Sequence, residues 1–396
     1  MTSLKEKKLE TKPLIIVSLF LSRFAVSSPR IIIGLFLIEI AASFGSSVGV
    51  MGQITTISSL VGMITSLLLG ALSVRFRHKS LLVLGLVFLT VSTLGCFAAP
   101  NYLTMLTFYS IIILGGAIAV PMTSTLVASH FLIDQRSHVL GWLVAGGALA
   151  VSFGAPIIAR IGDWRPAFLG YVFPFALLSL VLSVTGIPSV HQEDVLGKRS
   201  TSYIEGFKAI LANKSAVACL TGNALGNAGW QAIFLYSSSF FRQRYYVSTE
   251  LASLLVFGGA LCVTLGSLVS GRVVNRVGRK RLMVLVSGLL GVCLMAYTAV
   301  SSLWFATGAR FFGSWLAGMM FSASASLELE QLPRFRGTMM SISAAMQSVG
   351  SALGAAIGGF TLLIYGYELL GISLGVLAVI GAIIVHLLAV DPITPR

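Results

Sequence analysis

The chain has 396 residues, of which 56% are hydrophobic and only 10% are charged, and its formal net charge is +14. A soluble globular domain carries roughly 25% charged residues, because its surface has to be covered with polar groups. The composition therefore excludes a soluble fold and predicts a membrane protein. The first apolar segment follows a lysine-rich start. We expect it to be an uncleaved helix, because no clear cleavage site follows it and many more apolar segments come after it.

Twelve segments are apolar over a length that can cross a bilayer, for which a helix needs about 20 residues. In chain order we predict spans at 13–37, 48–73, 79–98, 102–127, 138–161, 166–187, 215–241, 249–274, 281–301, 303–328, 337–363 and 367–390. If the N-terminus is cytoplasmic, 20 of the 27 basic residues fall on the inner side, four fall outside and three lie within spans. This bias is typical of cytoplasmic loops. It predicts a multi-pass protein of the plasma membrane with both termini cytoplasmic, and it explains the net charge without a nucleic-acid partner.

Two sequence landmarks recur at an interval of about 200 residues. A glycine-plus-basic segment between spans begins at Gly70 and again at Gly271, and a basic entry to the fifth span of a half occurs at Arg136 and again at Arg336. We therefore predict two six-span halves, 1–187 and 215–396, joined by a polar cytoplasmic linker at 188–214. In transporters built from such repeats, the substrate site lies between the halves near the middle of the bilayer.

The segment Gly271–Lys280 resembles the loop signature of the major facilitator superfamily, G-x-x-x-D-R-x-G-R-K/R, with Asn275 where the family usually has Asp. The N-terminal copy departs further, because Val74 replaces the Asp and Arg77 replaces the second Gly. In the family this loop is a latch that holds one access state. The residues that the resemblance assigns to the two gating loops are Gly70, Arg75, Gly271, Asn275, Arg276, Gly278, Arg279 and Lys280. The alternative is that these cations only anchor the cytoplasmic end.

Three further segments resemble motifs of the same family. Gly147–Pro156 is similar to the fifth-helix motif of its antiporters, Trp164–Phe168 to the W-R-x-x-F entry to the sixth helix, and Arg310–Gly313 to its R-x-x-x-G signature. The chain resembles twelve-span prokaryotic drug or sugar efflux permeases. The resemblance implies an all-α membrane fold of two pseudo-symmetric six-helix bundles and proton-linked efflux of small organic solutes. We expect a monomer.

The residues assigned to the fifth-helix motif are Gly147, Gly154 and Pro156. Small residues at four-residue spacing allow close approach between helices, and they occur at Gly146, Ala150 and Gly154 and again at Gly350, Gly354 and Gly358. That approach would provide either static packing or a sliding surface for a conformational change.

Arginines within the predicted spans are the first candidates for a substrate cavity. Arg23 lies roughly 16 Å into the first span and Arg310 roughly 12 Å into the tenth, at 1.5 Å per residue. Neither is suited to face lipid, because an arginine at a helix centre costs about 2.5–3.5 kcal/mol. Arg30 follows Arg23 by seven residues and shares its helix face with Ser27. The functional interpretation is a cationic patch in an aqueous cavity. The alternative is that Arg30 extends outward to the interface and Arg23 pairs with backbone carbonyls at a kink near Pro29.

The seventh span adds a polar stripe of Asn223, Asn227, Trp230 and Gln231, which share one helix face. We predict that they line the cavity and shape recognition. They could instead hold helices together within a bundle.

None of the 13 acidic residues is predicted deep in a span. A proton-coupled exporter usually places a carboxylate there, since that group has to load and release a proton. Glu39, near the outer end of the first span, is the remaining candidate for proton coupling. It could equally be an interfacial residue.

The sequence contains no P-loop, no H-E-x-x-H metal motif and no G-x-S-x-G elbow. We therefore expect no enzyme activity, no cofactor and no metal. The leading hypothesis is a secondary transporter that works by alternating access and exports a small organic molecule in exchange for protons. The first alternative is uptake or exchange of an organic anion, which buried arginine without buried acid favours. The second is a non-transporting membrane sensor on the same fold, which a pathway plugged by large apolar residues would favour.

Overall fold

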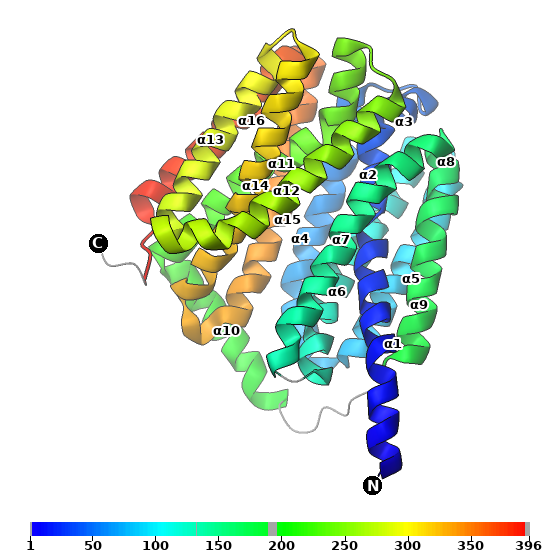
Figure 1. Ribbon diagram of the computed structural model, residues 1–396, viewed down its shortest axis with the longest axis vertical. Coiled ribbons are helices and arrows are strands. Elements are labelled where there is room, and N and C mark those ends of the chain that lie inside the picture. The colour runs from blue at the N-terminus through cyan, green and yellow to red at the C-terminus, as the bar shows by residue number, and fades with distance from the viewer. Residues whose placement is uncertain (1, 132, 189–195, 393–396) are drawn as a thin grey trace.

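The computed structural model describes residues 2–131, 133–188 and 196–392, and in these ranges it contains helices and no strand. The side chains of 2–12, 70–75, 133–134, 137, 196–203 and 275 lie outside the description. Long helices run roughly parallel along the length of the molecule (Figure 1). We call the end where α1 begins and α10 lies the inner end, and the opposite end the outer end.

Ten elements precede the linker. They are α1 (Thr2–Ser27), α2 (Pro29–Leu35), α3 (Leu37–Ser43), α4 (Val48–Arg75), α5 (His78–Phe97), α6 (Tyr102–His130), α7 (Ile133–Ile161), α8 (Trp164–Ala167), the π-helical η1 (Phe168–Val172) and α9 (Phe173–Gly186). The first helix is interrupted at Ser28, directly before Pro29, where we predicted a kink. Proline has no backbone N–H to donate within a helix, so it suits the first turn of α2.

Eight elements follow. They are α10 (Leu196–Ala212), α11 (Lys214–Tyr245), α12 (Thr249–Val277), α13 (Arg279–Ala299), α14 (Leu303–Gln331), the 3₁₀-helical η2 (Pro333–Phe335), α15 (Arg336–Ile364) and α16 (Tyr367–Leu388). Ten helical segments in the described ranges are long and apolar enough to cross a bilayer. The predicted spans on α11 and α14 are not among them, because these helices carry polar residues such as Asn223, Asn227 and Arg310. The count of twelve spans stays a prediction.

The helices pack into two groups. In the first, α1 packs on α7 and α9, and α5 packs on α6 and α9; in the second, α11 packs on α15 and α16, and α13 packs on α14 and α16. The groups meet where α4 lies against α15, where α7 lies against α12, and where α2 and α3 touch α11. The predicted boundaries 1–187, 188–214 and 215–396 stay predictions, and residues 189–195 of the linker lie outside the described residues.

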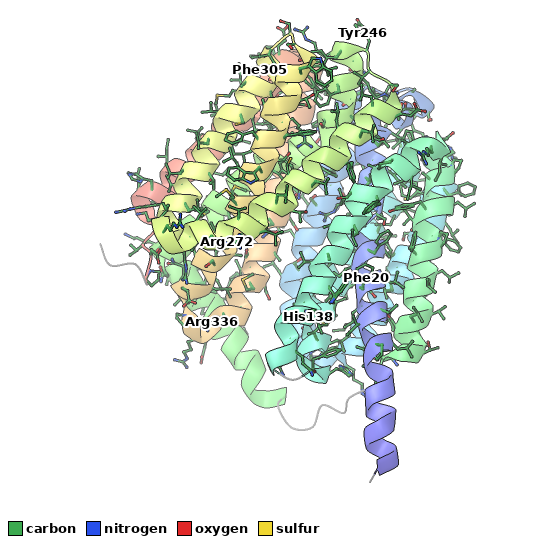
Figure 2. All side chains as sticks on the ribbon, viewed as in Figure 1. Phe20, His138, Tyr246, Arg272, Phe305 and Arg336 are labelled. Carbon is green, nitrogen blue, oxygen red and sulfur yellow. The ribbon has the colours of Figure 1, made fainter. Side chains whose placement is uncertain are left out.

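Side chains on the surface differ between the two ends. Arg272 and Arg336 project toward the inner end, whereas Tyr246 and Phe305 project at the outer end (Figure 2). Tyr246 is 89% exposed and Phe305 is 59% exposed. Basic residues are typical of a cytoplasmic membrane border, and tyrosine is typical of a membrane–water interface.

The loop between α12 and α13 consists of Gly278 alone, with φ 88° and ψ 152°. This conformation is essentially restricted to glycine. At the equivalent position between α4 and α5, Arg77 has φ −63° and ψ 132°, which any residue adopts. The replacement of glycine by arginine in the N-terminal copy is therefore accommodated by a change in the sign of φ.

We predict that Gly278→Ala lowers the thermal stability of the purified protein, because an alanine held in this region of backbone space costs about 1–3 kcal/mol. Gly271→Ala is the matched control, since this glycine lies inside α12 and a Cβ there would meet nothing within 4 Å. Differential scanning fluorimetry in detergent should show a melting temperature lower by roughly 2–8 °C for the first variant only. Equal melting temperatures for the two variants would contradict the assignment.

Candidate functional site

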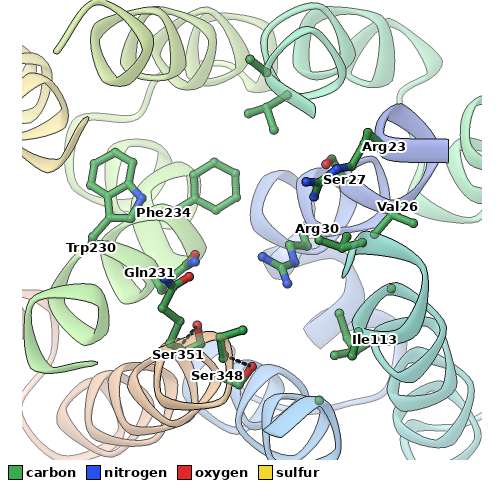
Figure 3. A pocket seen from close by; sticks show the side chains of 18 of the residues that line it. Arg23, Val26, Ser27, Arg30, Ile113, Trp230, Gln231, Phe234, Ser348 and Ser351 are labelled. Carbon is green, nitrogen blue, oxygen red and sulfur yellow. Dashed lines mark hydrogen bonds between the residues drawn. The ribbon is translucent and has the colours of Figure 1, made fainter. Parts of the chain in front are cut away.

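A cavity of about 460 Å³ lies between the two groups of helices, with lining residues from α1, α2, α4, α6, α7, α11, α12, α14 and α15. Six of the eight residues predicted for the substrate cavity line it: Arg23, Ser27, Arg30, Trp230, Gln231 and Arg310. Figure 3 shows Arg23, Ser27 and Arg30 on one side, facing Trp230, Gln231 and Phe234 on the other. The cavity thus has a cationic wall and a polar and aromatic wall.

The cationic wall keeps unused hydrogen-bond donors. Arg23 is half-buried; its Nη2 donates to Ser124 Oγ at 3.4 Å, and its Nε is buried without a partner. Arg30 is exposed, and within the described part of the chain it forms no hydrogen bond or ion pair. A guanidinium group is always charged and presents five donors. These two residues can therefore bind an acceptor that enters the cavity.

Arg310 is held more firmly. It is 4% exposed; its Nε donates to Ser237 Oγ at 3.1 Å, and its Nη1 donates to Ser314 Oγ at 2.6 Å. Its guanidinium carbon lies 5.0 Å from the centre of the Trp230 ring, in cation–π geometry. No described acidic residue forms an ion pair with it. The two hydroxyl groups and the ring stabilise the guanidinium group without cancelling its charge.

None of the described residues that line the cavity is acidic. Three guanidinium groups therefore create a positive potential at its centre. The apolar parts of the surrounding helices form low-dielectric walls, which focus this potential into the cavity.

Asn223 and Asn227 are not among the described residues that line the cavity. Asn227 Nδ2 donates to the backbone oxygen of Gln347 at 2.7 Å and to Ser351 Oγ at 3.3 Å, so it joins α11 to the lining helix α15. Asn223 Nδ2 donates to Glu328 Oε1 at 2.8 Å, inside the C-terminal group of helices. The helical spacing predicted that the four residues share one face of α11. Trp230 and Gln231, the two nearer the outer end, lie at the cavity.

The sequence predicted that no acidic residue lies deep in a span, and Glu328 is only three positions from the end of α14. Its side chain is nevertheless fully buried by neighbouring helices. Nothing in the sequence indicated this burial, because Glu328 falls at the last position of the predicted span 303–328, where a charge is ordinarily interfacial. In the structure, Asn223 and Ser343 provide it with polar partners from the neighbouring helices α11 and α15.

Glu39 lies on α3 and pairs with Arg242 of α11, so the two groups of helices are joined by an ion pair near the outer end. Arg242 Nη1 donates to Glu39 Oε2 at 3.0 Å, and Nη2 donates to the second carboxylate oxygen. Both side chains are partly exposed, at 31% and 17%. A role of Glu39 in proton coupling stays a prediction.

Further contacts close the outer end. Ser238 Oγ of α11 donates to the backbone oxygen of Leu35 at 3.0 Å. A Cβ on Gly49 would lie 2.6 Å from the backbone oxygen of Gly359, so α4 and α15 approach closely there. A small pocket of about 40 Å³ extends from Arg30 and Phe234 toward these contacts. The two groups of helices are therefore in tight contact on the outer side of the cavity.

The remaining predicted residues are not among the described residues that line the cavity. Gly147 and Gly154 let α7 pack against its neighbours, since a Cβ on Gly147 would lie 3.2 Å from Ser27 Oγ and one on Gly154 would lie 2.6 Å from Tyr171 Oη. Pro156 lies within α7.

At the inner end, Gly271 and Arg276 belong to α12, and Arg279 and Lys280 begin α13 beside Gly278. For Gly70, Arg75 and Asn275 the structure describes only the backbone. The latch function of both loops stays a prediction.

A cavity with a mixed polar and apolar lining, at the interface of two groups of helices, is typical of a membrane transporter. The chain matches the family model described as Major Facilitator Superfamily over residues 16–263 and 240–396. It therefore belongs to that superfamily, as the loop signature indicated.

Relatives support the same assignment. The chain is 22% identical over 394 residues to YwfA, an uncharacterized MFS-type transporter of Bacillus subtilis, with coverage of 97% of this chain and 95% of the relative. It is 22% identical over 373 residues to a probable sugar efflux transporter of Pasteurella multocida, with coverage of 93% and 90%. Its fold is similar to that of a D-xylose-proton symporter, with a TM-score of 0.75 at 16% identity and coverage of 96% and 98%.

We predict that the Glu39–Arg242 ion pair stabilises the closed outer end. Glu39→Arg should place two cations together, and Glu39→Arg with Arg242→Glu should restore the pair. A partly exposed ion pair contributes up to about 1 kcal/mol, so its loss should increase outer access by roughly fivefold.

The measurement is the labelling rate of a Ser348→Cys reporter in the cavity by a membrane-impermeant maleimide added from the outer side. The four native cysteines are first replaced, because two of them are only partly buried. A rate that is unchanged in the single variant, or that stays raised in the exchanged pair, would argue against a closing role.

Proposed function

We propose that this chain is a secondary transporter that carries a small organic anion through the central cavity by alternating access. The observation that carries the proposal is the lining of the cavity, in which Arg23, Arg30 and Arg310 occur without an acidic residue among the described lining residues. A cationic or strongly hydrated neutral solute would gain little there. An anion would gain both the potential and the unused donors.

Arg23 and Arg30 are the binding groups in this proposal. They lie on the same wall with unused N–H donors, and a guanidinium group matches the planar, two-oxygen geometry of a carboxylate or the oxygens of a phosphate. Arg310 contributes mainly through its charge, because it is almost fully buried and two of its donors already bind Ser237 and Ser314.

The opposite wall suits the uncharged part of the substrate. Gln231 offers an amide donor and acceptor, whereas Phe234 and Trp230 offer aromatic surface. A volume of about 460 Å³ lies within the range of about 300–1,000 Å³ that is usual for sites of metabolite-sized or drug-sized molecules. The substrate class is therefore an organic anion with a polar or planar body.

Alternating access is supported by the distribution of contacts between the two groups of helices. The ion pair Glu39–Arg242, the Ser238 hydrogen bond and the close approach of Gly49 to Gly359 all lie on the outer side of the cavity. If the halves rock about the cavity, these contacts open and equivalent contacts form at the inner end. A pathway plugged by large side chains would favour a sensor, whereas this cavity favours transport.

For direction and coupling we propose export from the cytoplasm in exchange for protons, with both termini cytoplasmic in the plasma membrane. The probable sugar efflux transporter of Pasteurella multocida supports the direction, since its name refers to efflux. The D-xylose-proton symporter supports only coupling to protons, because a symporter moves its solute and the proton in the same direction. The basic residues Arg272 and Arg336 toward the inner end support the orientation. Uptake or exchange of the anion, without protons, is the outcome that would replace it.

Transport by purified protein in lipid vesicles tests the proposal. The vesicles are loaded with monocarboxylates, dicarboxylates and sugar phosphates, and with amines and neutral sugars for comparison. We expect an anion to be transported, and we expect Arg23→Gln and Arg30→Gln to weaken its apparent affinity. Each charge-assisted hydrogen bond contributes about 1.5–3 kcal/mol, which corresponds to roughly 10–100-fold.

Arg160→Gln is the matched control, since Arg160 is an exposed arginine near the outer end of α7 and does not line the cavity. Its affinity should equal that of the unmodified chain. Preferred transport of amines, or normal affinity in both cavity variants, would rule out the anion site.

A further inference from the structure

We infer that Glu328, together with Asn223 and Ser343, forms a proton-binding site within the C-terminal helices that acts on the wall of the cavity. The three residues lie on three different helices, α14, α11 and α15. The inference deepens the proposed function by locating a group for proton exchange. Only its link to transport rests on that function.

The carboxylate is enclosed on every side. Glu328 is 0% exposed, Asn223 is 1% exposed and Ser343 is 1% exposed. Ser343 Oγ donates to Glu328 Oε2 at 2.6 Å, and Asn223 Nδ2 donates to Glu328 Oε1 at 2.8 Å. Each carboxylate oxygen therefore has one neutral partner, which comes from a different helix in each case.

No cation neutralises this carboxylate within the described part of the chain. The three ion pairs there involve Glu39, Glu368 and Glu330, and not Glu328. Of the titratable groups on α11, the thiol of Cys219 is the one that interacts electrostatically with Glu328, and Lys280 of α13 and Asp391 act on the same thiol. No charged residue of α12 or α15 is bonded to the carboxylate. A buried carboxylate without a cation is costly, and taking up a proton removes that cost.

The site can satisfy both protonation states. Asn223 Oδ1 is a buried acceptor without a partner. When the carboxylate is ionised, Asn223 Nδ2 donates to it, as observed. When one proton is added at Oε1, a half-turn of the amide would bring Asn223 Oδ1 round to accept from the new O–H group, while Ser343 continues to donate to Oε2. An amide supplies both a donor and an acceptor in the same place, which an apolar cage would not do.

The same residues connect the carboxyl group to the cavity. Asn227 lies one turn after Asn223 on α11 and donates to Gln347 and Ser351, and both of these line the cavity. Gln347 in turn lies one turn after Ser343 on α15. A change in the hydrogen bonds of Glu328 to α11 and α15 therefore acts on two helices that carry polar residues of the cavity lining. Glu328 is three residues from the inner end of α14, so the inner side is the nearer source of a proton.

A purely structural role predicts something different. A side chain that only bridges α11 and α15 would remain in one protonation state, and glutamine would replace it without other consequences. A proton-binding site has to change state while the protein stays folded. The two possibilities are separated by observing the carboxyl group itself.

Infrared difference spectroscopy of the purified protein between acidic and alkaline pH tests the inference. We expect a carboxylic C=O stretching band that is present at acidic pH and lost at alkaline pH. Glu328→Gln should abolish this band, and Glu328→Asp should retain it at a shifted frequency. Glu330→Gln is the matched control, since Glu330 lies two residues away on α14 in an ion pair with Arg336, and it should leave the band unchanged.

A band that persists in Glu328→Gln, or a carboxyl group that stays in one state over the whole range in which the protein remains folded, would overturn the inference. Glu328→Asp keeps the test valid if the glutamine variant does not fold, because the aspartate band then has to titrate. These spectra need no substrate, so their outcome is independent of the proposed function.

The link to transport is tested in the vesicles that contain the carboxylates and sugar phosphates named above. In the unmodified protein a pH gradient should change the initial rate of anion movement. In Glu328→Gln the gradient should have no effect, whereas exchange of the anion across the membrane should continue. A gradient effect that survives in this variant would break the link. If the unmodified protein moves none of these anions, the proposed function fails and the spectroscopic result stands.

Discussion

A guanidinium group that is removed from water needs hydrogen-bond acceptors, and at Arg310 these come from neutral groups. Ser237 and Ser314 accept its N–H groups, and the face of Trp230 covers it. An acidic partner would have stabilised the arginine equally well but would have cancelled its charge. The choice of neutral partners fixes α11 against α14 and leaves a positive charge at the cavity. The sign of the cavity potential, and hence the class of solute, depends on this arrangement.

The contacts that close the outer end are individually weak, and this suits a protein that has to open and close. Glu39 and Arg242 are partly exposed, so their ion pair contributes little compared with a buried one. Close approach of Gly49 to Gly359 relies on dispersion forces between backbones, which form and separate without leaving a buried charge behind. Contacts within each group of helices include a buried hydrogen bond to a carboxyl group, Asn223–Glu328, whereas the buried hydrogen bond from Ser238 to Leu35 between the groups joins neutral partners. Separation between the groups is therefore favoured over disruption within them.

The family and the helical fold follow from the sequence, because the length of an apolar segment and the placement of basic residues are local properties. The position of Arg23 and Arg30 on one wall also follows, since both lie on one face of one helix. What helix periodicity cannot supply is the neighbour that each face meets. Trp230 and Asn223 share a face of α11, yet one lies at the cavity and the other meets α14, because the cavity occupies only part of the length of the helix. Glu328 was missed for the same reason. Its burial depends on Asn223 and Ser343, which are 105 and 15 residues away in the chain.

Arg310 and Glu328 show two solutions to the burial of an ionisable group in one set of helices. A guanidinium group cannot lose its charge in a protein, so Arg310 requires a permanent set of acceptors and gives the cavity a field that does not change with pH. A carboxyl group can lose its charge by binding a proton, so Glu328 requires partners that serve both states, and the unpaired oxygen of Asn223 provides the second set. The permanent charge of Arg310 is suited to select the solute. Protonation of Glu328 is suited to change the arrangement of the helices that line the cavity. Because α11 carries partners of both groups, selection and switching are separate in their chemistry but connected through one helix.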